Sequence, residues 1–227
     1  RKFNFLWMSW EDHVGTPHGN TFKATIASTF LALYGKKFDS EQMETLVKAN
    51  QTCRPLYLIT LLNEMRRFGT FELVSEHLES LLEAEDCVML FTAVLQRLQA
   101  TSVDPETFET LCKILWCSRN GVSENELQLC QGDDAMEDEA YDRFRHHTRQ
   151  VFVNRGGIVS FIHRDLKTAI EMIYLDGGKR ETVSLARQNL IRVLEDRYRQ
   201  LKITRYSVGS DRTLAISPLE WYPDSEF

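Results

Sequence analysis

The chain has 227 residues, of which 43% are apolar, with only 11 glycines and 5 prolines, so it belongs to neither the collagen-like nor the disordered classes of protein. Its 33 acidic and 27 basic residues give a formal net charge of −6, which excludes a polycation built for nucleic acid. No apolar run approaches the ~18 residues that a membrane span needs, so we expect no membrane partner. Five irregularly spaced cysteines and no recognisable secretory signal predict a reduced, cytoplasmic location.

The first part of the chain is predicted to be a helical bundle. Residues 1–20 show no clear periodicity and are assigned to an atypical N-terminal segment. From Thr21 onward, apolar residues recur at three- and four-residue spacing, which predicts a first helix. Asp39 and Gln42 form a capping-box pattern at the start of a second helix. Pro55 predicts the first turn of a third helix. Two further amphipathic segments complete a helical domain over residues 21–103.

The second part, residues 104–176, is predicted to be a winged helix. Asp104-Pro105 is a helix start, and two more helices follow it. The apolar period then changes from 3.6 to 2 on either side of a Gly-Gly turn, which predicts a β-hairpin over residues 151–162. Three helices followed by a hairpin is the order of a winged helix, so the fold class is mainly α with a small β-hairpin wing. Residues 177–227 are expected to form a C-terminal helix and a possible hairpin.

The chain lacks the sequence of an autonomous nucleotide hydrolase. A P-loop needs two glycines five positions apart, followed by Lys and then Ser or Thr. Gly35-Lys36-Lys37 and Gly178-Lys179-Arg180 each lack the first glycine and the hydroxyl residue. Nor does an apolar strand end in the paired acids that would hold magnesium. We therefore expect no catalytic residues and no ATP hydrolysis by this chain.

A metal site is also not expected. Cys112 and Cys117 are spaced more widely than the usual zinc pair, and the sequence contains no second pair. Cysteines within apolar helical patterns usually behave as small buried hydrophobes. No feature of the sequence activates one thiol as a nucleophile.

Charge is distributed unevenly around the predicted wing. Residues 123–142 hold eight acids and neither Lys nor Arg, whereas residues 143–167 hold six Lys or Arg and one acid. An alternative hypothesis is therefore a winged-helix nucleic-acid-binding module. The bases that would contact the phosphates are Arg143, Arg145, Arg149 and Arg155. The acidic run beside them would repel phosphate, which counts against nucleic acid as the partner.

Several stretches, taken in order, resemble the region immediately after the nucleotide-binding core in NACHT-type STAND NTPases. The resemblance covers about residues 22–175 and is closest to relatives of nephrocystin-3, of telomerase-associated protein and of the tetratricopeptide-repeat protein known as Grp94-neighbouring nucleotidase. The matching stretches are Phe30–Phe38, Arg54–Leu58, Leu61–Gly69, Leu115–Leu127 and Phe161–Leu166. Each is weak alone, but their order and spacing together are fairly specific.

The resemblance implies a helical domain and a winged-helix domain that pack on a nucleotide site in an ADP-locked state. Pro55 matches the proline that lies against the adenine, and His163 matches the histidine that reaches the ADP β-phosphate. ADP or ATP would then be bound by the intact parent protein, and this chain itself would hold no cofactor. A truncated, alternatively spliced or decaying copy would explain why residues 1–20 and those after Asp176 depart from the family pattern.

The leading hypothesis is therefore a regulatory and interaction fragment of a NACHT-type nucleotide switch. It lacks the P-loop core, and its winged helix would be the bistable element. Its partners would be other proteins or the parent nucleotide-binding domain. A nucleotidase-related activity ranks last, because no acid pair, metal cluster or phosphate loop supports it.

Overall fold

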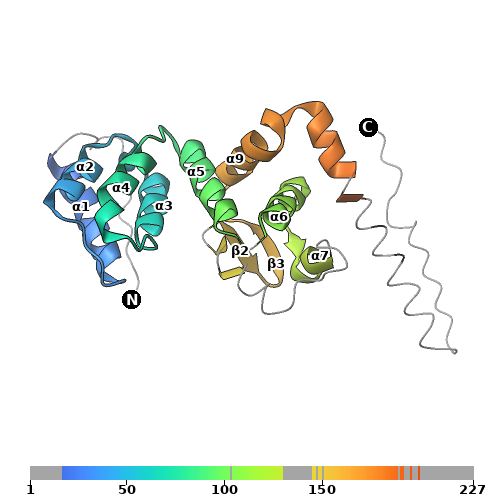
Figure 1. Cartoon of the computed structure of the whole chain (residues 1–227), viewed down its shortest axis with the longest axis horizontal. Coiled ribbons are helices and arrows are strands. Elements are labelled where there is room, and N and C mark those ends of the chain that lie inside the picture. Colours follow the sequence, from blue (N-terminus) through green and yellow to red (C-terminus); the bar gives the residue numbers. More distant parts are fainter. Residues whose placement is uncertain are drawn as a thin grey trace.

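The computed structural model describes residues 17–102, 104–129, 145–146, 148–149, 151–188, 190–191, 195 and 199. Within them the chain is mainly helical with one small antiparallel sheet, which confirms the predicted mainly α class (Figure 1). The helices are α1 (Pro17–Ala32), α2 (Ser40–Lys48), α3 (Pro55–Met65), α4 (Val74–Leu82), α5 (Cys87–Ala100), α6 (Pro105–Cys117), α7 (Glu124–Leu129) and α9 (Arg164–Tyr174). Short 3₁₀ turns occupy Gln51–Cys53, Phe71–Leu73 and Asp176–Gly178, and residues 180–188 are helical. Among the described residues, none of the helices combines the length and the apolar character required to cross a membrane.

The predicted helix starts are confirmed where a cap or a proline marks them. The Asp39 carboxylate accepts a hydrogen bond from the backbone N–H of Gln42 at 2.8 Å, and the Gln42 side chain accepts from the Asp39 N–H in return. Pro55 is the first residue of α3, and Asp104 caps α6. Helix α1 begins at Pro17, inside the segment predicted to be atypical. A proline in the first turn is a common helix start, and it outweighs the weak periodicity there.

Lys23 in α1 and Lys36 in the loop that follows α1 each donate to backbone carbonyls of neighbouring segments. The Lys23 side chain is 3% exposed, and its ammonium donates to the backbone oxygens of Val47 and Ala49 at the C-terminal end of α2. The Lys36 ammonium donates to the Phe68 carbonyl, just beyond α3, at 2.6 Å. Carbonyls at a helix C-terminus lack partners within the helix and carry partial negative charge, so a cation is stabilising there.

The sheet has three strands, β1 (Val122–Ser123), β2 (Phe152–Arg155) and β3 (Ile158–Phe161), in the order β1-β3-β2. The predicted hairpin is confirmed, because β2 and β3 pair antiparallel with Phe152 opposite Phe161. Gly156 and Gly157 both have positive φ, as a tight two-residue turn between twisted strands requires. Strand β1, which pairs with β3 from the far side, was not predicted.

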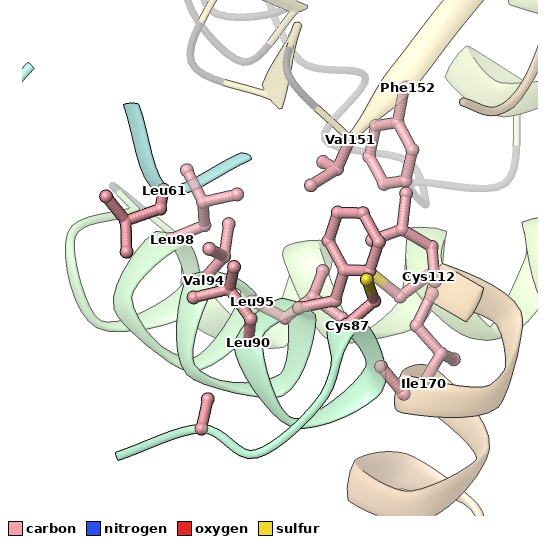
Figure 2. Packing of buried hydrophobic residues seen from close by; sticks show 14 of the residues in the cluster. Leu61, Cys87, Leu90, Val94, Leu95, Leu98, Cys112, Val151, Phe152 and Ile170 are labelled. Atoms are coloured by element: carbon pink, nitrogen blue, oxygen red, sulfur yellow. The ribbon is translucent and has the colours of Figure 1, made fainter. Parts of the chain in front are cut away.

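Helix α5 lies between the two parts of the molecule and packs against both (Figure 1). In Figure 2, Leu61 of α3 lies beside Leu98 toward one end of α5, while Cys112 of α6 and Ile170 of α9 lie toward the other end. The Tyr174 hydroxyl on α9 adds a hydrogen bond to the Gln99 side chain at 3.0 Å. The buried residues form one continuous apolar cluster that runs from α1 to α9. The predicted boundary at residue 104 falls in the loop between α5 and α6, and the core extends across it.

A largely buried ion pair joins α3 to α5. Glu64 is 2% exposed, and both of its carboxylate oxygens accept from the Arg97 guanidinium, at 2.5 and 3.0 Å. Such a two-bond fork fixes the relative orientation of the two helices. A buried carboxylate depends on its partners, because the charge has been removed from water.

Removal of Arg97 therefore destabilises the protein. Arg97→Met should lower the free energy of unfolding by about 2–3 kcal/mol, less than the ~3–5 kcal/mol typical of a fully buried pair, because Arg97 is 31% exposed. Lys113→Met is the matched control, since it removes a surface pair with Glu109 on α6 and should cost less than about 0.5 kcal/mol. Urea unfolding of both variants measures the difference, and equal costs would contradict the structural role given to the Glu64–Arg97 pair.

Candidate functional site

An open pocket of about 500 Å³ lies where the C-terminal end of α6, strand β3 and the first turn of α9 meet. Leu115 and Phe161 supply apolar wall, and the loop from Ser118 to Gly121 forms the opposite rim. His163, Arg164 and Lys167 line it from the α9 side. Three segments distant in sequence thus build one concavity.

The pocket is electropositive. Arg119, Arg164 and Lys167 line it, and no acid is among the described lining residues. Beside the pocket, the Asp165 carboxylate lies 3.5 Å from His163 Nδ1 and 3.7 Å from the Arg164 guanidinium. The Lys167 ammonium lies 5.6 Å from the centre of the Trp116 ring and 3.4 Å from the Ser118 carbonyl oxygen, which fixes it at the rim. Three cations around one concavity favour an anionic ligand.

His163 is the N-cap of α9, and the hydrogen bond of this cap determines which ring nitrogen of a neutral imidazole carries the proton. Its Nδ1 accepts a hydrogen bond from the backbone N–H of Asp165 at 3.2 Å. A neutral imidazole that accepts at Nδ1 carries its proton on Nε2. The Nε2–H is therefore the donor that the half-buried ring offers, at a helix end where the dipole also favours negative charge.

Gly121 allows the rim to approach the sheet. Its φ is +99°, and a Cβ at this position would lie 2.4 Å from the Val159 carbonyl oxygen and 2.7 Å from Ile158 Cγ2. Only glycine fits both the conformation and the space. This close approach brings Val122 into register with Val159 and so creates β1.

Pro55 is exposed in the first turn of α3, away from the lining of the pocket. The structure therefore places Pro55 outside the pocket that His163 lines.

Two of the described cysteines, Cys112 and Cys117, have thiols that burial makes less acidic. Burial raises the pKa of Cys112 far above its usual range and raises that of Cys117 as well. These thiols are protonated at neutral pH and are weak nucleophiles. Among the described residues, no group of three or more His, Cys, Asp or Glu side chains is arranged to hold a metal ion.

The four arginines of the nucleic-acid hypothesis have different surroundings. Arg143 lies outside the described residues. The Arg145 guanidinium pairs with Glu124 at 2.9 Å, so one acid of the neighbouring run neutralises it. Arg149 is exposed; burial lowers the pKa of the Arg67 guanidinium, and the charge of Arg149 is the smallest of the contributions that lower it. Arg155 is exposed at the hairpin turn.

The positive pocket beside His163 is built instead from Arg119, Arg164 and Lys167. Sequence reasoning missed Arg119 as a lining residue, because only the close approach at Gly121 brings it there.

Gly121→Ala should destabilise the protein by about 2–4 kcal/mol, because a side chain there is strained and collides with backbone. Gly35→Ala is the matched control: Gly35 also has positive φ, +66°, but nothing lies within 4 Å of its added Cβ, so only about 1 kcal/mol should be lost. Urea unfolding compares the two variants. If both lose the same amount, the contact between Gly121 and β3 does not shape this rim.

A family model for the helical domain of nephrocystin 3 matches residues 26–174, from within α1 to the last residue of α9. A TPR repeat-containing protein of Dictyostelium discoideum is 22% identical over 166 residues, which cover 72% of this chain and 10% of that protein. Nephrocystin-3 of Xenopus laevis is 26% identical over 162 residues, which cover 69% of this chain and 12% of that protein. The chain thus spans about a tenth of the length of these relatives. No solved structure matches it. The chain belongs to the nephrocystin 3 helical-domain family.

Proposed function

We propose that this chain is a regulatory and interaction module of a NACHT-type nucleotide switch, packing against a nucleotide-binding core that lies outside the 227 residues. The observation that carries the proposal is the pocket beside His163. It combines one oriented Nε2–H donor with three cations, at the position that the family resemblance assigns to a phosphate contact. These groups fit a diphosphate, because charged donors bind phosphate oxygens strongly.

We infer that residues 104–176 form a winged helix. The order of elements supports this reading: α6 is followed by β1 and α7, and the β2–β3 hairpin comes after residues that are only partly described. The strand order β1-β3-β2 also supports it, because the hairpin returns beside the short first strand. His163 then stands directly after the wing, where the hairpin leads into α9.

The nucleotide would contact the module at two helix starts, those of α9 and α3. The His163 Nε2–H, with Lys167 and Arg119, would face phosphate, and the exposed ring of Pro55 would offer an apolar surface to the base. Helix α9 is packed on α5, and α5 on α3, so both contacts belong to one packed unit. Loss of the phosphate contact would release this unit from the core, which is how a ligand shifts a two-state equilibrium.

The pocket can be tested with inorganic pyrophosphate as the probe. We expect saturable NMR shifts of the His163 ring with a dissociation constant on the order of 1 mM, because the rest of a nucleotide site is absent. Lys167→Met should weaken binding at least threefold. Arg145→Gln is the control with equal loss of charge, since Arg145 pairs with Glu124 and does not line the pocket.

The absence of saturable shifts, or equal weakening in both variants, would overturn the phosphate role.

The same preparation should show no ATP turnover. Turnover that persists after repurification would overturn the assignment of the chain as a non-catalytic module.

A further inference from the structure

The chain continues beyond α9 as a helix over residues 180–188, and this helix lies outside the matched family range, which ends at residue 174. Val183 and Ala186 of this helix, with Leu190 shortly after it, recur at three- and four-residue spacing. All three are partly buried and pack against the main apolar cluster. The helix is therefore docked on the rest of the molecule along one apolar stripe.

Trp116 of α6 joins this helix to the positive pocket. The Arg187 guanidinium lies 5.8 Å from the centre of the Trp116 ring, and the Lys167 ammonium lies 5.6 Å from the same centre. The face of an aromatic ring attracts a cation, so one indole holds both side chains. Lys167 also lines the pocket, whereas Arg187 is not among the lining residues. Trp116 thus connects a residue of the pocket with a residue of the following helix.

The position of the Trp116 ring depends on packing and on these two cations. The side chain is 7% exposed, and its indole N–H is the one buried side-chain polar atom without a hydrogen-bond partner in the part of the chain that the structure describes. No hydrogen bond of the ring therefore competes with its attraction for Lys167 and Arg187. Because Trp116 is nearly buried, it offers Lys167 a firm support at the rim.

Charge couples the two cations. Burial raises the pKa of the thiol of Cys117, the residue after Trp116, and the charges of Arg187 and Lys167 both oppose that rise. Like charges held on one ring repel each other, and a phosphate group bound beside Lys167 would offset this repulsion. In return, Arg187 docked on the ring adds positive potential near the pocket, which favours an anion there.

The turn before the helix leaves its docking to these contacts. Asp176, Gly177 and Gly178 have φ angles of +52°, +68° and +81°. Two adjacent glycines have wide conformational freedom, so the turn alone does not fix the direction of the helix that follows. The Lys179–Asp176 ion pair across the turn is exposed and contributes little. The apolar stripe and the contact of Arg187 with Trp116 therefore decide whether the helix docks.

We propose that the helix over residues 180–188 regulates the positive pocket: docking of Arg187 on Trp116 and binding of a phosphate group beside Lys167 strengthen each other. This inference rests on the phosphate role proposed above. It adds Arg187 as a fourth cation that acts from outside the pocket, and Trp116 as the residue that positions Lys167. Such coupling is reciprocal. Because the charges act through screened solvent, we expect a factor of about two to three in dilute buffer.

The coupling is tested first by pyrophosphate binding, followed through the His163 ring by NMR in salt of about 20 mM and about 0.5 M. Arg187→Gln should weaken binding about two- to threefold in low salt and leave it unchanged in high salt, where a long-range charge is screened. Arg187→Lys keeps the charge and should bind as the unmodified chain does. Arg180→Gln is the matched control, because it removes an equal charge from the exposed first residue of the same helix, about 10 Å further along its axis.

Two further signals come from the chain without a change in charge. Saturating pyrophosphate at constant ionic strength should slow amide hydrogen exchange of residues 183–187 about two- to threefold, because the docked helix is then favoured. The indole N–H resonance of Trp116, identified by its absence in Trp116→Phe, should shift together with the His163 ring.

The possible failures are distinguishable. Equal affinity of Arg187→Gln and the unmodified chain in low salt, or exchange that pyrophosphate leaves unchanged, would overturn the coupling. A weakening that persists in high salt would show that Arg187 acts through packing alone, which also overturns it. An indole resonance that does not shift would remove the positioning role of Trp116. If the unmodified chain binds no pyrophosphate, the proposed function fails and this inference fails with it.

Discussion

The structure depends on one helix whose apolar stripe is shared by the two parts of the molecule. The buried residues of α5 recur at three- and four-residue spacing along one face, while Met89, Gln96 and Ala100 on the opposite face are exposed; the buried residues are Cys87, Leu90, Phe91, Val94, Leu95 and Leu98. Removal of this stripe from water brings both α3 and α9 with α6 against the same helix. The helical part and the sheet-containing part therefore share their core, and the matched family range includes both of them.

This packing positions the candidate pocket. Because α9 packs along α5, its N-cap His163 lies at the rim of the positive pocket, and α5 also packs against α3. A ligand that contacts His163 thus acts on a unit that reaches to α3. Beyond α9, the helix over residues 180–188 brings Arg187 to the Trp116 ring, which Lys167 of the pocket also approaches. The pocket is therefore linked to the shared core on one side and to the following helix on the other.

Much of the fold could be predicted because its signals are local. Asp39, Pro55 and Asp104 mark helix starts through their own side chains, and the Gly-Gly turn selects a hairpin through backbone geometry. Strand β1 could not be predicted, because two residues show no periodicity and the strand exists only through pairing with β3. The pocket also required tertiary structure: His163 was identified by its resemblance to a family motif, but Arg119 joins it through the conformation of Gly121. Likewise, the burial of Lys23 and the pairing of Arg145 with Glu124 arise from contacts between residues far apart in sequence.

The central claim is that the two parts unfold together because they share α5. Amide hydrogen exchange of the slowest amides in α3 and in α9 tests it in the Leu95→Ala variant, where Leu95 is fully buried in the natural chain. The cavity should lower the free energy of opening by about 2–4 kcal/mol, and by the same amount in both helices. A loss confined to α3 or to α9 would show two independent units and contradict the account.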